Sequence, residues 1–275
     1  MLSTWSELVR LGVGEWVTVE ESRRRVIRAL AAAGCVAPAE EAEELLRAAR
    51  AGVGGLDALV ARRQRGEPLA WITGSIDFCG LRLRVDRGVY VPRPHTEAVA
   101  RRAASLLPAD GTAVVLCTGS GAVAAVMRSA RPDATVLATD RDHVAIACAR
   151  SNGVTAFLGD LDEPLPSSLQ GRIDVMTAVV PYVPTEELHL LPRDVVAYEP
   201  RHALDGGPRG TALLERVAEL SVRWLRPGGR VLLELGGDQA RALATTMSAV
   251  GLSKFRVYRD ADGHDRAIEA WVGST

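Results

Sequence analysis

Apolar and polar residues follow two different patterns along the chain, and the pattern changes near residue 72. From Met1 to about Ile72 the apolar residues recur at helical spacing, so we expect this whole segment to be helical. The clearest amphipathic stretches are 19–30, 38–50 and 56–65. Together they predict a small helical N-terminal domain, residues 1–72, of a size that more often docks a partner or caps a cleft than carries chemistry.

Strand-like alternation begins after Trp71. Residues 76–78 and 81–85 alternate with period two around Cys79-Gly80, which predicts a β-hairpin within a linker of residues 73–90. Pro92 and Pro94 then fix an extended stretch, and a helix is expected from about Thr96 to Leu107.

From residue 91 onward, short apolar runs typical of buried strands alternate with helical segments, which predicts a parallel, doubly wound sheet. The last two strands break this order, because only a short Asp-rich turn joins them and they must pair antiparallel. We therefore expect an α/β fold with a seven-stranded, Rossmann-like domain over residues 91–275. The expected strands begin at residue 113 and continue at 135–139, 155–158, 173–179, 230–235, 254–259 and 266–272.

A glycine-containing turn, Thr118-Gly119-Ser120-Gly121, joins the first of these strands to a helix. Glycine lets the backbone adopt strained angles and lets a ligand approach, and the amides of the next helix turn would face that ligand. About twenty residues on, Asp140 ends the second strand, a position suited to the hydroxyl pair of a ribose. The two features predict a nucleoside-cofactor site.

The turn by itself leaves the cofactor open. It fits NAD, FAD or S-adenosylmethionine, and a plain strand-to-helix joint has the same sequence. The closing antiparallel hairpin is unusual for dinucleotide folds and typical of S-adenosylmethionine methyltransferases. It therefore favours S-adenosyl-L-methionine.

Composition and charge narrow the partners and the compartment. A net charge of −1 gives no electrostatic footprint for nucleic acid, and no apolar run reaches 18 residues, so neither nucleic acid nor membrane is an expected partner. The four cysteines lie far apart and are expected to be buried thiols in a reducing compartment, which favours the cytoplasm. The five histidines show no H-x-x-x-H or H-x-H spacing, so no metal is expected.

Several segments resemble one family, the protein-(glutamine-N5) methyltransferases of the HemK or release-factor glutamine methyltransferase type. The resemblance runs in the family's order from about residue 20 to residue 272. The matching segments are Arg65-Gly66-Glu67-Pro68-Leu69-Ala70-Trp71-Ile72-Thr73-Gly74, Val91-Pro92-Arg93-Pro94-His95-Thr96-Glu97, Thr118-Gly119-Ser120-Gly121, Gly159-Asp160-Leu161, Pro181-Tyr182, Tyr198-Glu199-Pro200-Arg201 and Ala203-Leu204-Asp205-Gly206-Gly207.

The resemblance implies an N-terminal domain that helps recognise a protein substrate and a catalytic domain that binds S-adenosylmethionine. It implies that the loop formed by Cys117, Thr118, Gly119, Ser120 and Gly121 lies against the methionine part of the cofactor. Asp140 would take the ribose hydroxyls, with Arg141 beside it, and Asp160 with Leu161 would border the adenine. Two alternatives stay open: Asp140 as a helix N-cap, and Asp160 as the start of a loop.

The acceptor motif departs from the family. The family's Asn-Pro-Pro-Tyr corresponds here to Val179, Val180, Pro181 and Tyr182. The resemblance implies that the Asn oxygen and a neighbouring carbonyl accept hydrogen bonds from a glutamine amide, and valine offers no such acceptor. Its loss predicts roughly 10⁴-fold weaker discrimination for an amide. Tyr182 is the best remaining acceptor-side residue, and the alternative is that Pro181-Tyr182 forms a rigid loop with a packed ring.

Three further positions bear on the site. Val115 and Cys117 stand where the family's loop motif has an acid and a glycine, so the acid that supports the loop is absent. His95 replaces the glutamate of the Pro-Arg-Pro-Glu-Thr-Glu segment. We expect a surface or capping histidine, with contact to an acceptor as the alternative. Arg93 and Glu97 are expected to border the pocket.

These features predict an S-adenosylmethionine-dependent methyltransferase in which catalysis is mainly in-line positioning and desolvation. The first hypothesis is a divergent enzyme that acts on a protein or peptide, with a release factor as the model. The second keeps the chemistry but changes the acceptor to a small molecule. The third is a degenerate protein that binds cofactor or a partner without turnover.

Overall fold

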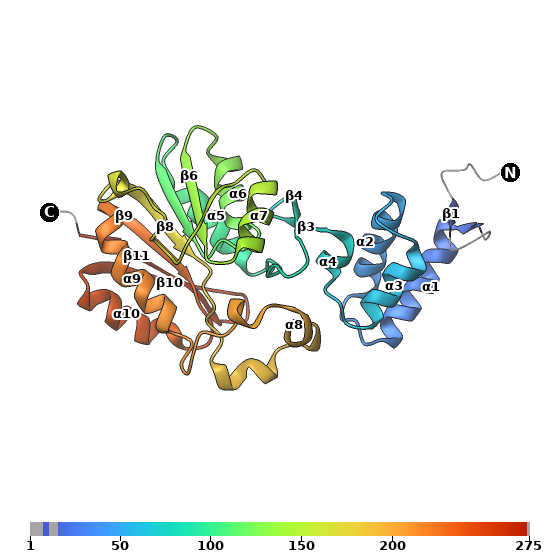
Figure 1. Ribbon diagram of the computed structural model, residues 1–275. Helices are drawn as coiled ribbons and strands as arrows, with labels where there is room; N and C mark the ends of the chain where they lie inside the picture. Colours follow the sequence, from blue (N-terminus) through green and yellow to red (C-terminus); the bar gives the residue numbers. More distant parts are fainter. Residues whose placement is uncertain (1–7, 11–15, 274–275) are drawn as a thin grey trace. The chain divides into compact units, whose positions relative to one another are not determined.

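The computed structural model describes residues 8–10 and 16–273, and Figure 1 traces their course along the chain. The chain divides into two compact units, which are described separately. One comprises residues 1–76 together with Pro192–Tyr198, and the other comprises residues 77–191 and 199–275. The limits predicted at residues 72 and 90 stay predictions. No local sequence pattern had assigned Pro192–Tyr198 to the N-terminal unit.

The first unit is a small helical bundle. Its helices are α1 (Val19–Ala32), α2 (Pro38–Arg50), α3 (Leu56–Gln64), α4 (Leu69–Thr73) and α8 (Arg193–Tyr198). The first three confirm the predicted helices. Leu30, Leu45 and Leu56 are fully buried at its centre. A two-point ion pair between Arg63 and Glu41, at 2.6 and 3.2 Å, holds the polar side of the bundle.

The expectation that the chain is helical from its first residues is wrong for the N-terminal part that can be described. Leu8–Arg10 and Trp16–Thr18 form two antiparallel strands, β1 and β2. Trp16-Val17-Thr18 is aromatic and β-branched, a composition that favours a strand over a helix. Residues 1–7 and 11–15 of the predicted helical segment lie outside the described residues.

The second unit is built on a seven-stranded sheet in the order β10-β11-β9-β8-β5-β6-β7. The pairs from β9 to β7 are parallel, and β11 pairs antiparallel with both β9 and β10. This confirms the predicted seven-stranded, Rossmann-like sheet and its closing hairpin. The strands are β5 (Thr112–Leu116), β6 (Thr135–Asp140), β7 (Thr155–Leu158), β8 (Ile173–Ala178), β9 (Leu225–Glu234), β10 (Leu252–Arg259) and β11 (Asp265–Val272).

Helices cover both faces of this sheet. The remaining helices are α5 (Thr96–Leu106), α6 (Ala122–Ala130), α7 (His143–Ser151), α9 (Ala212–Trp224) and α10 (Gln239–Ala249), and the predicted hairpin forms as β3 (Ser75–Phe78) and β4 (Leu81–Arg84). Val231, Leu233 and Ile268 share one buried cluster with the apolar sides of α9 and α10. Side chains alternate along a strand, so Glu234 and Glu269 lie on the opposite face, which α5 covers.

The helices of the described residues give no candidate for a membrane span, because none is both long enough and apolar enough.

Candidate active site

Four neighbouring parallel strands end at the same edge of the sheet, and their ends carry the candidate site. In spatial order these strands are β6, β5, β8 and β9. Asp140 ends β6, the glycine turn follows β5, Val179 follows β8 and Glu234 ends β9. Ligands of open α/β sheets bind outside the carboxyl ends of the strands. The cofactor turn and the acceptor motif therefore meet at one edge although about sixty residues separate them in sequence.

The two glycines of the turn have different roles. Gly121 has φ 82°, and a Cβ there would lie 2.9 Å from Val154 and 3.0 Å from Ala149, so glycine is required for packing against α7 and the strand that follows it. Gly119 has φ 54°, and no atom of the described residues would lie within 4 Å of a Cβ at that position. Only Gly119 borders open space that a ligand can enter.

Asp140 ties the turn to the end of β6. One carboxylate oxygen accepts a hydrogen bond from the Gly119 N–H at 2.8 Å, and the other accepts one from the Asp142 N–H at 3.0 Å. The alternative that Asp140 caps the next helix is wrong, because Asp142 is the N-cap of α7 and accepts from the Val144 N–H at 2.8 Å. Burial raises the pKa of the Asp140 carboxyl, and the two backbone hydrogen bonds oppose that rise.

The turn fits a polar nucleoside ligand. The hydroxyl oxygens of Thr118 and Ser120 are buried and have no hydrogen-bond partner among the described residues, so they are available to a polar ligand. Cys117 adopts φ 52°, and burial raises the pKa of its thiol to about 12, so the thiol is neutral. These features make Thr118, Gly119 and Asp140 the candidates to hold S-adenosylmethionine at this edge, and their roles toward the cofactor stay predictions.

The remaining predicted cofactor residues differ in their burial and in their hydrogen-bond partners. Leu161 is buried with φ 48°, and its carbonyl accepts a hydrogen bond from the Thr139 hydroxyl at 2.7 Å. Asp160 pairs with Arg216 at 2.9 Å on the surface. Arg141 is exposed and donates to the backbone carbonyl of His202 at 3.3 Å. Their roles toward the cofactor stay predictions.

The acceptor segment is held by the Leu-Asp-Gly-Gly segment. The Val183 N–H donates to the carbonyl of Leu204 at 3.1 Å, and the Gly206 N–H donates back to the carbonyl of Val183 at 2.8 Å. A Cβ at Gly206 would lie 2.7 Å from the Pro181 carbonyl oxygen, so only glycine permits this approach. The segment thus fixes the backbone of Pro181-Tyr182. Val180 is buried in the core and Val179 is half-buried.

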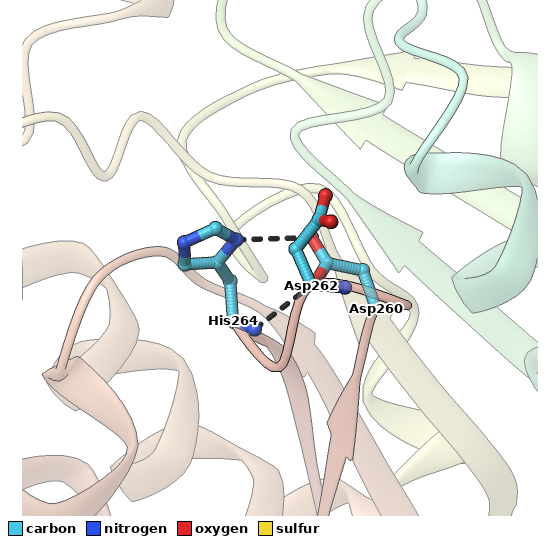
Figure 2. A group of neighbouring side chains, drawn as sticks. All are labelled: Asp260, Asp262 and His264. Carbon is cyan, nitrogen blue, oxygen red and sulfur yellow. Dashed lines mark hydrogen bonds and ion pairs between the residues drawn. The ribbon is translucent and has the colours of Figure 1, made fainter.

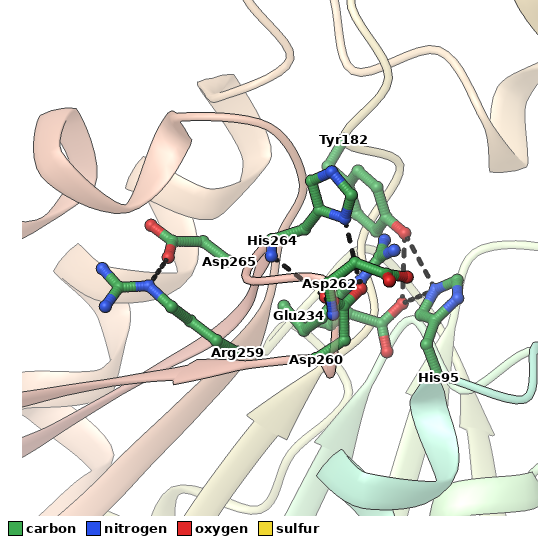
Figure 3. A network of polar contacts seen from close by, with 9 residues as sticks. His95, Tyr182, Glu234, Arg259, Asp260, Asp262, His264 and Asp265 are labelled. Carbon is green, nitrogen blue, oxygen red and sulfur yellow. Dashed lines mark hydrogen bonds and ion pairs between the residues drawn. The ribbon is translucent and has the colours of Figure 1, made fainter.

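Tyr182, Glu234 and His95 form a polar cluster at the acceptor end (Figure 3). The Tyr182 hydroxyl donates to Oε1 of Glu234 at 3.2 Å, and Nε2 of His95 lies 3.3 Å from the same oxygen. His95 Nε2 also lies 3.4 Å from the Tyr182 hydroxyl. Burial and the charge of Glu234 raise the pKa of that hydroxyl well above its usual range, so it stays protonated and donates.

His95 is therefore more than a surface or capping residue. It occupies the N-cap position of α5, but its side chain makes no capping hydrogen bond. The imidazole instead faces Glu234 and Tyr182, and 28% of the side chain is exposed. Of the alternatives, the structure supports a position beside the acceptor-side residues. Sequence could not show this, because its partners lie 87 and 139 residues away.

Arg93 and Glu97 have partners of their own. Arg93 donates to the buried carboxylate of Glu199 at 2.8 Å and lies 4.7 Å from the ring centroid of Tyr90. The Pro-Arg-Pro and Tyr-Glu-Pro segments are thus joined by an ion pair. Glu97 accepts from the Cys79 N–H at 3.1 Å and from Arg101 at 2.6 Å, which ties it to the hairpin and to its own helix.

The turn between β10 and β11 gathers Asp260, Asp262 and His264 (Figure 2), whose ligand-type atoms lie within 4.8 Å of one another. Asp260 already accepts hydrogen bonds from Arg266 at 2.7 Å and from the backbone N–H groups of Asp262 and His264. Its slight burial raises the pKa, but these bonds outweigh it and lower the pKa to about 2. They account for the cluster as a paired turn, and we assign no metal to it.

Two residues of this region were not predicted from the sequence. Glu234 stands in the apolar run Val231-Leu232-Leu233-Glu234-Leu235, and an acid within a buried strand was the available signal. Tyr90 lies beside Arg93. Burial is the main reason that the pKa of the Tyr90 hydroxyl is raised to about 12. The charge of Glu234 contributes to that rise, which places Tyr90 near the same cluster.

Comparison with solved structures defines the class of the fold. The chain is similar to a methyltransferase from Pyrococcus furiosus, with a TM-score of 0.51, 19% identity and coverage of 70% of this chain and 90% of that one. It is also similar to the hMettl16 catalytic domain, solved in complex with MAT2A 3′UTR hairpin 6, with a TM-score of 0.54, 14% identity and coverage of 77% and 81%. The fold is that of the S-adenosylmethionine-dependent methyltransferases.

Curated relatives define the family. The chain is 35% identical to the release factor glutamine methyltransferase of Geobacter sulfurreducens over 221 residues, 78% of this chain and 77% of that protein. It is 34% identical to that of Moorella thermoacetica over 283 residues, 93% and 99% of the two chains. No family model matches the chain. The chain belongs to the release factor glutamine methyltransferases and is an S-adenosylmethionine-dependent methyltransferase.

Proposed function

We propose that the protein methylates the side-chain amide of a glutamine in a protein substrate of the release-factor class. The observation that carries this proposal is the extent of the match to the Moorella thermoacetica enzyme, which includes 93% of this chain and 99% of that one. A match of that length includes most of the helical N-terminal unit as well as the catalytic unit. We assign that unit to recognition of the protein substrate.

The chain's own residues position the reactants. When bound, S-adenosylmethionine supplies a methyl group on a sulfonium, which is already a good electrophile. Gly119 and Asp140 hold one side of the site, and Pro181-Tyr182 forms the other on a backbone that Gly206 and Gln239 fix, the latter through a 2.8 Å bond to the Tyr182 carbonyl. Val179 and Val180 make the end of β8 apolar. Holding donor and acceptor in line accounts for most of the acceleration such a site can give.

The test is direct. The purified protein is incubated with radiolabelled S-adenosylmethionine and a purified release factor, and peptide mass spectrometry locates the added methyl group. We expect label on one glutamine of the release factor. Calorimetry first establishes that the preparation binds S-adenosylmethionine. Binding without any label on the release factor contradicts the proposal, and labelling of a small-molecule acceptor instead favours the second hypothesis.

We further propose that the protein works in the cytoplasm. Cys35, Cys79, Cys117 and Cys148 are all free thiols, as expected in a reducing compartment. The net charge of −1 supports a protein rather than a nucleic-acid substrate. A fusion to a fluorescent protein, imaged in the producing cell, should give a diffuse internal signal.

A further inference from the structure

The end of β9 holds a carboxylate that the fold leaves half satisfied. Glu234 is fully buried, at 0% exposure. Its Oε1 atom receives both contacts, from the Tyr182 hydroxyl and from His95. Its Oε2 atom is also buried and has no hydrogen-bond partner among the described residues. Burying a polar group without a partner costs free energy, so this atom is available to accept a hydrogen bond from a ligand.

The position of this oxygen matters because Val179, at the end of β8, offers no side-chain hydrogen-bond acceptor. β8 and β9 are parallel neighbours, and Ala178 pairs in register with Leu233. Val179 and Glu234 are the next residues on the two strands, so they occupy equivalent positions at the same edge. Valine removes the oxygen that would accept an amide hydrogen at the end of β8. Glu234 places another oxygen at the end of the adjacent strand.

We propose that Oε2 of Glu234 binds the acceptor N–H and receives its proton during methyl transfer, while Tyr182 and His95 act as positioning residues that hold Oε1. This inference rests on the proposed function, because it names the atom that takes over from the missing Asn. It predicts an acceptor that bears a hydrogen on the reacting atom, as a glutamine amide does.

The step balances without a further reactant. The lone pair of the acceptor nitrogen forms the new N–C bond, the bond from that methyl carbon to sulfur breaks, and its electron pair stays on sulfur. The proton that the nitrogen loses goes to Oε2 of Glu234. After the methylated product leaves, Oε2 gives this proton to solvent, and the partly exposed side chain of His95 marks where the cluster borders solvent.

His95 makes this arrangement possible where a glutamate would not. An imidazole N–H can donate to the Glu234 carboxylate, whereas a second carboxylate at about the same place would repel it. Two positions differ from the family motif, His95 in the Pro-Arg-Pro segment and Val179 after β8. Both thus affect how the acceptor is bound. We expect their effects on methyl transfer to be coupled.

The experiment uses the full chain and two matched substitutions. Glu234→Gln keeps the shape and an acceptor oxygen for Tyr182 but removes the proton acceptor. Glu269→Gln makes the same change at a buried acid on the same face of the sheet, outside the site. For Glu234→Gln we expect kcat toward the release factor to fall at least about 100-fold, the usual range for loss of a general base. Affinity for S-adenosylmethionine should stay within about twofold, and Glu269→Gln should keep kcat.

His95 is tested as a positioning residue by a conservative rescue. His95→Gln retains an N–H donor and should keep kcat within about threefold, whereas His95→Phe fills the space without a donor and should lower kcat about tenfold, the value of one hydrogen bond to a charged group. The Michaelis constant for S-adenosylmethionine should not change in either variant. Equal losses in both variants would show a merely structural role and overturn this part of the inference.

The outcome separates the inference from the proposed function. If the wild-type protein labels the release factor and Glu234→Gln does so at a similar kcat, the inference is overturned and the proposed function stands. If the wild type gives no label, the proposed function fails. The inference is then decided by the affinity of the release factor for the protein loaded with S-adenosylhomocysteine. That affinity should weaken about tenfold in Glu234→Gln, and equal affinities overturn the inference.

Discussion

Glu234 and Glu269 are two fully buried acids on the same face of one sheet, yet their surroundings differ in a way that separates structure from function. Both carboxylate oxygens of Glu269 on β11 have hydrogen-bond partners. Arg102 of α5 binds both of its oxygens, at 2.8 and 3.0 Å, and the Tyr258 hydroxyl donates at 2.5 Å. Glu234 on β9 has no arginine among the partners that the structure gives it, and its Oε2 atom has no hydrogen-bond partner among the described residues.

The same helix supplies a partner to each acid. Arg102 and His95 are seven residues apart, about two turns, so they project from one side of α5 onto the sheet. Arginine gives a permanent charge and a two-point pair, whereas histidine gives a single contact to the carboxylate. A buried acid that only holds the fold together is fully paired. A buried acid with a free oxygen costs stability, and the fold retains it at the edge where the substrate is expected.

The largest expected effect on stability is at Glu269. Glu269→Gln leaves the Arg102 guanidinium without its charged partner and should lower the free energy of unfolding by about 3 kcal/mol, the lower end of the range for a broken buried pair, because Arg102 can reach water. Urea unfolding followed by circular dichroism measures it. Glu234→Gln is the matched control and should change the same quantity by less than about 1 kcal/mol, since it breaks no ion pair with arginine. Equal losses of unfolding free energy in the two variants would show that the two acids contribute alike to stability, against the prediction.

A third acid is Asp140, at the end of β6. Its substitution tests whether this carboxylate contributes to cofactor binding. Asp140→Ala removes the acceptor for the Gly119 N–H and the expected ligand of the ribose hydroxyls. It should weaken the affinity for S-adenosylmethionine about 30-fold, the value of one or two hydrogen bonds to a charged group. Isothermal calorimetry reports the dissociation constant directly. Asp160→Ala changes an acid whose partner is the surface residue Arg216, and its affinity change should be smaller than that of Asp140→Ala.

Giving Glu234 the partner that Glu269 has should convert a functional acid into a structural one. In His95→Arg a guanidinium can bind the carboxylate at two points and compete with the acceptor for its oxygens. We expect kcat for methyl transfer to fall about tenfold and the melting temperature to stay level or rise. The measurement is steady-state kinetics beside a thermal scan. Full activity with an arginine at this position would argue that the carboxylate has no part in the reaction.

The smallest effect expected is at the partner of Glu269. Arg102→Lys keeps the charge but loses the two-point geometry, so the free energy of unfolding should fall by about 1 kcal/mol. The kcat for methyl transfer should not change, because Arg102 contacts Glu269 and not the site. Chemical unfolding and the methylation assay on one preparation give both values. A loss of activity larger than the loss of folded protein would show that the two acids are linked.

Much of the fold follows from local pattern. The alternation of strands and helices, the strand order's closing hairpin and the three N-terminal helices were all predictable, because each depends on spacing within a short window. The strands Leu8–Arg10 and Trp16–Thr18 were missed, since the expected helical pattern of the bundle was extended too far back. Helix α8 was missed because its six residues are too few to show a period.

The candidate site was only partly predictable. The turn at Gly119, Asp140 and the acceptor segment could be found because their spacing follows the order of the strands. The role of His95 could not be found, because its contacts join the start of α5 to the ends of two distant strands. Glu234 could not be identified for the same reason. The sequence shows an acid in an apolar run, but only the structure shows that its Oε2 atom has no hydrogen-bond partner among the residues described.

A crystal structure of the protein with S-adenosylhomocysteine and a glutamine-containing segment of a release factor would show whether Glu234 binds the acceptor. The measured quantity is the distance between Oε2 of Glu234 and the amide nitrogen of the bound glutamine. We expect about 2.9 Å, a hydrogen bond aimed at the atom that receives the methyl group. An amide nitrogen farther than about 3.5 Å from Glu234 and bound by other groups would contradict the account.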